Sequence, residues 1–325
     1  IDMYAGRLRN QVSFMLSACN FYMPIFEEAL DAYGLPLELR YLPIIESALN
    51  PSAVSRAGAS GLWQFMIGTG KIYGLESNSL VDDRRDPIKA TWAAARYLKE
   101  MYAIYGDWNL VIAAYNCGPG TINKAIRRAN GETDYWKIYN YLPKETRGYV
   151  PAFIAANYVM TYYCDHNICP METNIPASTD TVQVNKNLHF EQIADLCNVP
   201  LDQVKSLNPQ YKKSIIPGDN KPYTLRLPIE AISSFIDKQD TIYAHRADEL
   251  FRNRRTVAVK DVTPATRKTT TAVAGKGKLT YHTIKSGDTL SSIAGRYGVK
   301  VKDIQRWNGL SSTKIAAGKR LKIYK

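Results

Sequence analysis

A short pattern occurs twice in the second half of the chain, and its two copies are 100 residues apart. An Ile-Ala pair, a Val, an Asn and a Gly recur in the same order at 193–194, 199, 208 and 218, and again at 293–294, 299, 308 and 318. The spacing predicts two short helices and a strand in each copy, and a strand over 279–285 opens the second copy. The repeat therefore predicts two small α+β modules of the βααβ type, each of about 45 residues.

Two segments of unusual composition mark the expected domain boundaries. Residues 171–180 are rich in Pro, Ser and Thr, which is typical of a connector. Residues 241–278 contain 9 basic and 3 acidic side chains and few large apolar ones, which indicates a flexible tether. We therefore expect a first domain at 1–172 and a first module at 180–230. A helix with a basic linker is expected at 231–278, and a second module at 279–325.

The first 172 residues favour helices throughout. Asp86 and Pro87 provide a cap and a first-turn residue for a helix over 88–105, and Gly106-Asp107 ends that helix and caps the next. Because no alternation of Val and Ile indicates a strand, we expect an all-α domain with a buried core. The other expected helices span 108–115, 23–32, 37–49, 122–129 and 146–163.

The net charge of +12 belongs almost entirely to the second half of the chain. Residues 1–172 carry 16 basic and 17 acidic side chains, whereas the remainder carries 26 and 13. The basic half favours an anionic partner, but no nucleic-acid-binding motif accompanies it, so we expect no nucleic acid. No run of about 18 apolar residues predicts a transmembrane helix. No basic-then-apolar leader follows Ile1, so either a targeting segment was removed or the sequence starts inside a longer one.

Four short motifs of the helical domain carry the candidate chemistry. Glu46-Ser47 follows a largely apolar stretch, and a carboxyl group among apolar neighbours acquires the raised pKa that a general acid needs. The other motifs provide glycines beside an amide, a Tyr hydroxyl beside an Asn amide, and a carboxylate in the first turn of a helix; they lie at 58–66, 114–118 and 142–150. Each motif also has a simpler explanation. Glu46 could be an ordinary surface residue, 58–66 a turn, 114–118 the C-cap of a helix, and 142–150 a helix start whose Glu stabilises the helix dipole.

In this order and spacing, the four motifs resemble the family 1 lytic transglycosylases, whose catalytic domain is an α-helical relative of goose-type lysozyme. The resemblance covers about residues 30–165 and implies a lysozyme-like fold. The modules resemble LysM domains, which bind glycans that contain N-acetylglucosamine, because 286–290 and Trp307-Asn308 match their pattern. The first module departs from it, since Asn185-Lys186-Asn187 stands where a Gly-Asp-Thr turn is expected.

The resemblance implies roles for individual residues. Glu46 is the single catalytic acid, which protonates the oxygen between N-acetylmuramic acid and N-acetylglucosamine and then takes a proton from the C6 hydroxyl, giving a 1,6-anhydro end. Tyr115 is expected to hold the Glu46 carboxyl by a hydrogen bond, and Glu145 to meet the peptide stem. The implied substrate-binding residues are Ser55, Gln64, Met66, Tyr115, Asn116, Glu145 and Tyr149. The implied glycan-binding residues of the second module are Gly287, Asp288, Thr289, Leu290, Asn308 and Ile315.

The implied partner is peptidoglycan, and the implied location is the bacterial periplasm, with membrane association only through a removed N-terminal anchor. No cofactor is expected, and no metal either, because the four His residues lack ligand spacing. We interpret the charged cluster at 82–86 as a loop and a cap with ion pairs rather than as a second catalytic carboxylate. The five cysteines cannot all pair, and a Cys164–Cys169 bridge and free thiols remain equally open.

Three classes of function remain open. The first is a peptidoglycan lytic transglycosylase, and the second is a hydrolase of the goose-lysozyme type on the same fold. The third is a non-catalytic wall-binding protein that uses its LysM modules. The combination of Glu46, Gln64 and Tyr115 favours the two enzymes, because a mere scaffold does not need it.

Overall fold

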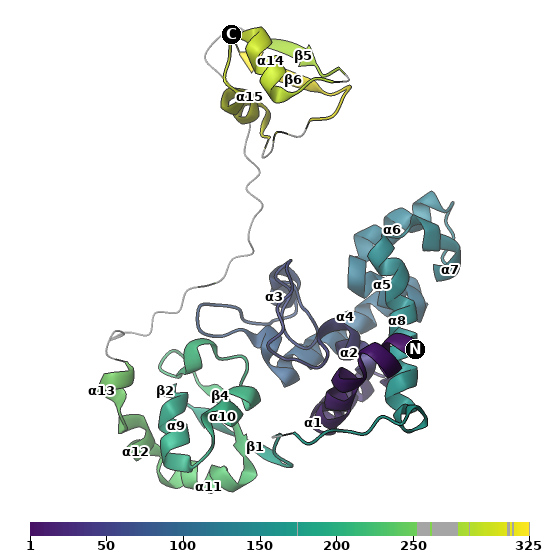
Figure 1. Cartoon of the computed structure of the whole chain (residues 1–325). Coiled ribbons are helices and arrows are strands. Elements are labelled where there is room, and N and C mark those ends of the chain that lie inside the picture. Colours follow the sequence, from purple (N-terminus) through teal and green to yellow (C-terminus); the bar gives the residue numbers. More distant parts are fainter. Residues whose placement is uncertain are drawn as a thin grey trace. The chain divides into compact units, whose positions relative to one another are not determined.

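The computed structural model describes residues 1–173, 175–251, 261, 279–285, 287–310, 313 and 315–324. The chain divides into two compact units, with the boundary between residues 262 and 263. The first unit contains the helical domain and the first module, drawn from purple to green, and the second contains the second module (Figure 1). From residue 252 on, the expected basic linker lies outside the described residues, apart from Asp261.

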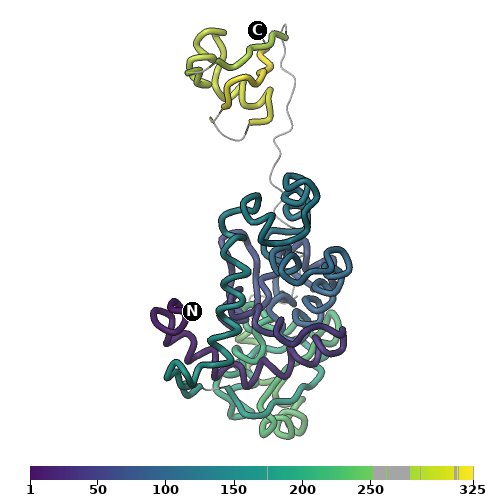
Figure 2. The backbone as a smooth tube through the Cα atoms, turned by 90° about the vertical axis from the view of Figure 1, so that its right-hand side faces the viewer, coloured from purple at the N-terminus to yellow at the C-terminus, as the bar shows by residue number. Residues whose placement is uncertain are grey.

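Helices form the first domain, and no strand of the described residues precedes Thr179, which confirms the all-α prediction. The α-helices are α1 (Arg9–Ala32), α2 (Leu42–Ser47), α3 (Ile67–Ile72), α4 (Pro87–Tyr105), α5 (Trp108–Cys117), α6 (Pro119–Arg128), α7 (Tyr135–Ile138) and α8 (Lys144–Thr161). Shorter helical turns are η1 (Met3–Arg7), η2 (Leu37–Tyr41), η3 (Asp83–Arg85), η4 (Tyr139–Tyr141) and η5 (Tyr163–His166). The segment η1 lies beside α8 (Figure 1 and Figure 2).

The sequence signals that start and stop the central helices act as predicted. The Asp86 side chain accepts hydrogen bonds from the backbone N–H groups of Ile88 and Lys89 and so begins α4. Gly106 ends α4 in the left-handed conformation, with φ of 63°. The Asp107 side chain accepts from the N–H of Leu110 and begins α5.

Two expected helices differ from the structure. The helix expected over 23–32 is the end of α1, which begins at Arg9 because Val12, Met15 and other earlier residues also face the core. The helix expected over 37–49 is divided between η2 and α2. It ends at Ser47 because Ala48 and Leu49 take left-handed φ angles of 51° and 57°.

The helix α5 lies at the centre of the domain. Its residues from Leu110 to Ala114 are at most 3% exposed, and α4, α6 and α8 contact it. Trp63 is also fully buried, and its indole N–H donates to the Thr91 hydroxyl at 2.9 Å. This core places α2 against α8, so that side chains far apart in the sequence meet.

The first module has its own core and two small antiparallel sheets, β1 with β4 and β2 with β3. Helices α11 and α12 add Phe235 and Ile242 to this core, so the helical part of the segment 231–278 belongs to the first module, and folded structure extends into the tether that was expected from 241. The elements are β1 (Thr179–Val184), β2 (Asn187–His189), α9 (Phe190–Cys197), α10 (Leu201–Leu207), η6 (Lys212–Ser214), β3 (Ile215–Pro217), β4 (Tyr223–Pro228), α11 (Ile229–Asp237), α12 (Gln239–Ala244) and α13 (Ala247–Leu250).

The second module has the predicted βααβ order. Its elements are β5 (Leu279–Thr283), α14 (Leu290–Tyr297), α15 (Val301–Asn308) and β6 (Arg320–Tyr324), and β5 pairs with β6 in antiparallel fashion. Ile293, Ile304 and Ile323 are fully buried in its core.

The five cysteines are free thiols. Of the two alternatives left open by the sequence, a Cys164–Cys169 bridge and free thiols, the structure therefore has the free thiols.

Among the described helices, none combines the length and the apolar character needed to cross a bilayer.

Candidate active site

Glu46 lies in the last turn of α2 and lines a pocket of about 550 Å³. The buried side chains of Leu42 and Ile44 hold this short helix on the core. Ser55 and Gln64 line the same pocket. The structure therefore brings together three of the residues that the sequence predicted for the site.

The environment of Glu46 changes its acidity. Burial raises the pKa of Glu46 from 4.5 to about 7. The Tyr149 hydroxyl donates a hydrogen bond to Oε1 of Glu46, which lowers this pKa in part, whereas the charge of Glu145 raises it. A carboxyl group that titrates near neutrality can donate a proton and later accept one at the same pH, so Glu46 is suited to both steps.

Tyr149, and not Tyr115, makes the hydrogen bond to Glu46, so the structure contradicts the bond expected from Tyr115, whereas its role in substrate binding stays a prediction. The Tyr115 hydroxyl donates instead to the backbone carbonyl of Trp63, at 2.7 Å, because α5 directs it toward the segment that precedes Gln64. Burial, followed by the charge of Glu46, raises the pKa of both tyrosines well above 10. Both phenols therefore remain neutral hydrogen-bond donors near the carboxyl group.

Residues 53–65, which we call the Gly-rich loop, form the side of the pocket that carries Ser55 and Gln64. The Ser55 hydroxyl oxygen accepts from the N–H of Ala59 at 3.0 Å. The Gln64 side-chain amide donates to the carbonyls of Gly61 and Ala53 at 2.9 and 3.3 Å. These bonds stabilise the loop from within, so Ser55 and Gln64 have structural partners as well as access to the pocket.

Three other predicted residues lie outside the pocket lining. Met66 is 45% exposed at the start of α3, and Glu145 is exposed in the first turn of α8. Oδ1 of Asn116 accepts a hydrogen bond from the Thr146 hydroxyl at 2.8 Å and so joins α5 to α8. Of these three, Glu145 influences the site through its charge.

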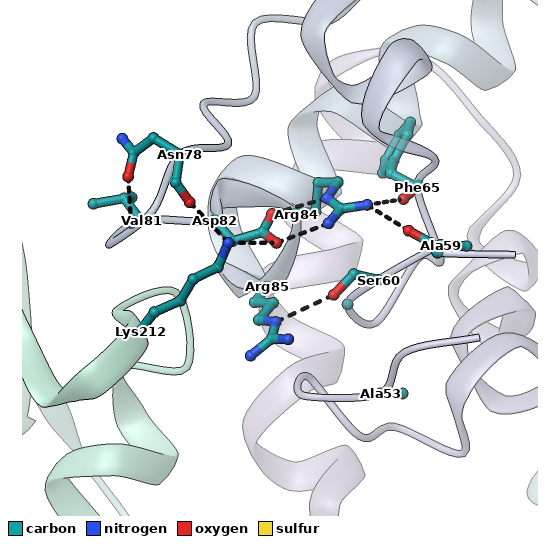
Figure 3. A network of polar contacts seen from close by, with 12 residues as sticks. Ala53, Ala59, Ser60, Phe65, Asn78, Val81, Asp82, Arg84, Arg85 and Lys212 are labelled. Atoms are coloured by element: carbon teal, nitrogen blue, oxygen red, sulfur yellow. Dashed lines mark hydrogen bonds and ion pairs between the residues drawn. The ribbon is translucent and has the colours of Figure 1, made fainter. Parts of the chain in front are cut away.

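The charged cluster at 82–86 is a loop and a cap with ion pairs, as predicted. Asp82 pairs with Arg84 at 2.8 Å, Asp83 pairs with Lys89 at 3.0 Å, and Asp86 caps α4. Figure 3 shows the Asp82 carboxylate directed toward Arg84 and toward Lys212 of the first module.

The sequence motifs missed the N-terminal contribution to the pocket. Tyr4 of η1 is 7% exposed and lines the pocket, as do Leu8 and Gln11. Burial raises the pKa of Tyr4. These residues precede the stretch that resembles a known family, and the helical spacing of Tyr4 and Leu8 was the only signal for them.

A larger cavity of about 970 Å³ lies between α1 and α10. It contains none of the predicted site residues, and its lining includes Phe14, Phe21 and Tyr22. We therefore place the candidate active site at Glu46, in the pocket that also contains Ser55 and Gln64.

Several of the predicted glycan-binding residues in the second module have structural partners. Asp288 Oδ2 accepts from the N–H of Lys285 and is hydrogen-bonded with Nε2 of His282, both at 2.9 Å. Thr289 caps α14, and Leu290 is 1% exposed. Gly287 has a φ of 89°, which its turn requires.

Asn308 joins the second helix of its module to the last strand. Its amide donates to the carbonyls of Ile304 and Lys322 at 2.8 and 2.7 Å, and Oδ1 accepts from the N–H of Lys322 at 2.6 Å. Asn208 makes the equivalent three bonds in the first module, so the repeated Asn has the same structural role in both. Asn308 and Ile315 also line a groove of about 430 Å³.

Known families match three successive parts of the chain. Residues 23–138 match the transglycosylase SLT domain, 178–244 match the LysM-like domain of lytic transglycosylase MltD, and 282–323 match the LysM domain. The chain is therefore composed of a transglycosylase SLT domain followed by two modules of the LysM type, as the resemblance predicted.

Individual proteins resemble the chain to different extents. Membrane-bound lytic murein transglycosylase D of Escherichia coli (strain K12) is 32% identical over 294 residues, which are 89% of this chain and 60% of that protein. The soluble lytic murein transglycosylase of the same strain is 33% identical over 124 residues, which are 36% of this chain and 19% of that protein. The crystal structure of the 70 kDa soluble lytic transglycosylase from Escherichia coli matches 44% of this chain and 24% of that one, with 29% identity and a TM-score of 0.38. The chain thus spans less than two thirds of the length of these relatives.

Proposed function

We propose that the chain is a peptidoglycan lytic transglycosylase. It cleaves the β-1,4 bond between N-acetylmuramic acid and N-acetylglucosamine and leaves 1,6-anhydromuramic ends. The observation that carries the proposal is the Glu46 carboxyl group, which burial and Tyr149 hold in the pocket with a pKa of about 7. The SLT domain match and the relatives named above support the same activity.

Glu46 performs both proton transfers of this reaction. Its carboxyl group gives a proton to the glycosidic oxygen, the bond from that oxygen to C1 breaks, and the N-acetylglucosamine side leaves with a free hydroxyl. The Glu46 carboxylate then takes the proton of the C6 hydroxyl as that oxygen attacks C1 of the same muramic residue. The ring closes, Glu46 regains its proton, and no water is consumed.

The neighbours of Glu46 support these two steps. The neutral Tyr149 hydroxyl donates to the carboxylate that exists between them and fixes its orientation. Burial, and with it the Glu145 charge, opposes ionisation of Glu46, so that with a pKa of about 7 a large share of the resting enzyme carries the proton near neutral pH. Ser55 and Gln64 line the pocket from the Gly-rich loop and provide polar contacts for the sugar.

The second module binds the substrate polymer, and the enzyme acts in the bacterial cell envelope. Residues 279–325 include 10 basic and 2 acidic side chains, whereas peptidoglycan carries carboxylates on its stems and muramic residues. The LysM match over 282–323 and the groove beside Ile315 support binding to its glycan strands. We further propose a periplasmic position with an N-terminal membrane anchor; the name of the membrane-bound relative supports an association with a membrane.

Digestion of purified sacculi followed by mass spectrometry tests the proposal. We expect muropeptides with 1,6-anhydromuramic ends from the wild type and almost none from Glu46→Gln. Free reducing muramic ends would instead identify a hydrolase of the goose-lysozyme type. Unchanged digestion by Glu46→Gln would contradict the role of Glu46, and an absence of digestion by either protein, with sacculus binding retained, would indicate a non-catalytic wall-binding protein.

A further inference from the structure

The loop at residues 76–82, which we call the docking loop, belongs to the helical domain but packs into the first module. Leu80 and Val81 are 2% and 0% exposed and form part of the module core. Val81 forms a β-bridge with Tyr211, and the N–H of Asp82 donates to the carbonyl of Gln210 at 2.9 Å. The module is thus attached through buried apolar contacts and backbone pairing.

Polar contacts reinforce this attachment from both ends of the docking loop. Glu76 pairs with Lys221 at 2.7 Å and accepts a hydrogen bond from the Tyr223 hydroxyl at 3.1 Å. Nζ of Lys212 donates to the carbonyl of Asn78 at 2.9 Å and lies 3.6 Å from Oδ2 of Asp82. The Asp82 side chain is 2% exposed, so Lys212 forms an ion pair with a buried carboxylate.

The same carboxylate is connected to the Gly-rich loop through Arg84. Nε and Nη2 of Arg84 donate to the two oxygens of Asp82, each at 2.8 Å, and its Nη1 donates to the carbonyls of Gly58 and Phe65 at 2.8 and 3.0 Å (Figure 3). Arg85 adds a bond to the Ser60 hydroxyl at 3.2 Å. A continuous polar network therefore runs from Lys212 of the module to the loop that carries Ser55 and Gln64.

The neighbours of Asp82 favour its ionised form, whereas burial lowers the pKa of Lys212. Burial opposes ionisation of Asp82, but the hydrogen bonds and charge of Arg84, with the charges of Lys212 and Arg85, lower its pKa below the usual range. Loss of the Lys212 charge would leave Arg84 as the only partner of Asp82 among the ion pairs of the described residues. Such buried networks respond as a unit, so a change at one member alters the others.

The position of the docking loop also bears on glycan binding by the first module. In the second module, Leu310 and Ile315, which follow α15, line the groove. In the first module the equivalent segment after α10 begins with Gln210, Tyr211 and Lys212, and these residues pair with the docking loop. In the first module, the segment that corresponds to one wall of the groove is therefore covered by the docking loop.

We propose that the first module acts on the active site and not on wall retention, with Lys212 as a positioning residue that holds the Gly-rich loop through Asp82 and Arg84. The catalytic consequence rests on the proposed function, whereas the mechanical coupling does not. Under the proposed function, Ser55 and Gln64 of the Gly-rich loop provide contacts for the sugar. If these contacts are the same in the ground state and the transition state, loosening of the loop should raise KM more than it lowers kcat.

The test uses the full chain with Lys212→Met, the conservative Lys212→Arg, and Lys213→Met as the matched control on the exposed neighbouring lysine. We expect hydrogen exchange of peptides within 53–65 to accelerate about fivefold in Lys212→Met, to return toward wild type in Lys212→Arg, and to stay unchanged in the control. On soluble uncross-linked glycan strands, we expect KM to rise about fivefold in Lys212→Met with kcat changed less than twofold, and sacculus binding to stay at the wild-type level.

Hydrogen exchange that increases in the docking loop (76–82) but not in the Gly-rich loop (53–65) would overturn the mechanical coupling of the two loops, independently of the kinetic results. Wild-type kinetics in Lys212→Met, despite faster exchange in 53–65, would overturn the catalytic consequence. If the wild type itself gives no anhydro product, the proposed function fails while the exchange comparison still decides the coupling. Lys212→Gln, which keeps a donor for the Asn78 carbonyl but lacks the charge, provides the same comparison if Lys212→Met does not fold.

Discussion

The hydroxyl of Tyr149 donates a hydrogen bond to Oε1 of Glu46, although 103 residues separate the two in the chain. Glu46 ends the short helix α2 and Tyr149 lies in the second turn of α8, and the two helices pack against each other. The bond stabilises the ionised form of a carboxyl group whose burial disfavours that form. The acidity of Glu46 is thus a balance between these two effects, and each can be changed by mutation.

Tyr149→Phe removes the hydrogen bond and leaves the ring. We expect the pKa of Glu46 to rise above about 7, because only the effects that raise it remain. The alkaline limb of the pH profile of kcat/KM should therefore move to higher pH, and kcat/KM at pH 7 should fall about tenfold through the lost stabilisation of the carboxylate. Tyr115→Phe is the control, since its hydroxyl bonds to Trp63, and it should not move that limb. An unmoved limb in Tyr149→Phe would contradict our account.

Glu46→Gln should stabilise the folded chain, and the gain should depend on pH. The pKa of Glu46 is about 7 in the folded state and 4.5 as the reference, so the folded state binds the proton more tightly. Stability is therefore greatest below about pH 4.5 and declines as pH rises through 7, by up to about 3 kcal/mol. Gln cannot ionise and avoids this loss.

Urea denaturation at pH 4 and pH 8, followed by tryptophan fluorescence, measures the effect. The midpoint of Glu46→Gln should exceed that of the wild type at pH 8 and approach it at pH 4. Equal midpoints at both pH values would show that Glu46 keeps an ordinary pKa.

Gly61 and Gly58 form a natural pair for testing the packing of the Gly-rich loop. Both have a φ of 89°, but a Cβ atom on Gly61 would lie 1.7 Å from the carbonyl oxygen of Arg84, whereas one on Gly58 would meet nothing within 4 Å. Gly58→Ala should cost about 1–2 kcal/mol through its backbone conformation alone. Gly61→Ala should cost at least about 3 kcal/mol and also lower activity, because Arg84 must move. Similar free energies of unfolding for the two variants would contradict this difference.

Local sequence signals predicted the helix boundaries around α4 and α5, because the capping groups Asp86, Gly106 and Asp107 act within a few residues of themselves. They also predicted the βααβ order of the second module, since apolar spacing reports which faces are buried, whereas the first module has two strands on each side of its pair of helices α9 and α10. Glu46, Ser55 and Gln64 were placed in one site through a family resemblance, and the structure brings them to one pocket.

The family resemblance assigned the hydrogen bond of Glu46 to Tyr115, whereas Tyr149 makes it. Both lie in motifs with the right chemistry, and the choice depends on the packing of α2 against α8, which is a long-range property. The contribution of Tyr4 and the pairing of Lys212 with Asp82 are of the same kind. The resemblance to LysM domains implied that Asn308 binds glycan, which stays a prediction; its three bonds to the backbone of Ile304 and Lys322 explain why an Asn recurs at this position.

The repeated Asn provides a direct test of that structural role. Asn208→Ala and Asn308→Ala each remove an amide that bridges the second helix and the last strand of a module. We expect about 2 kcal/mol of local destabilisation for Asn208→Ala, because Asn208 is fully buried, and less for Asn308→Ala, because Asn308 is only partly buried. Hydrogen exchange should accelerate in β4 for Asn208→Ala and in β6 for Asn308→Ala, with the other module unchanged. Loss of sacculus binding by Asn308→Ala without faster exchange in β6 would instead support a direct contact with glycan.

The excess of positive charge in the second module predicts salt-dependent binding to the cell wall. Its 10 basic and 2 acidic side chains attract an anionic polymer over distances that salt screens, about 10 Å at 0.1 M and about 3 Å at 1 M. Binding of Glu46→Gln to sacculi should weaken at least about tenfold between 0.05 and 0.5 M NaCl, mainly through slower association. Neutral N-acetylglucosamine oligomers are the matched control, since they occupy the groove without charge and should bind equally at both salt concentrations. If sacculi also bind equally at both, the positive charge has no part in retention, and the groove beside Ile315 alone must account for it.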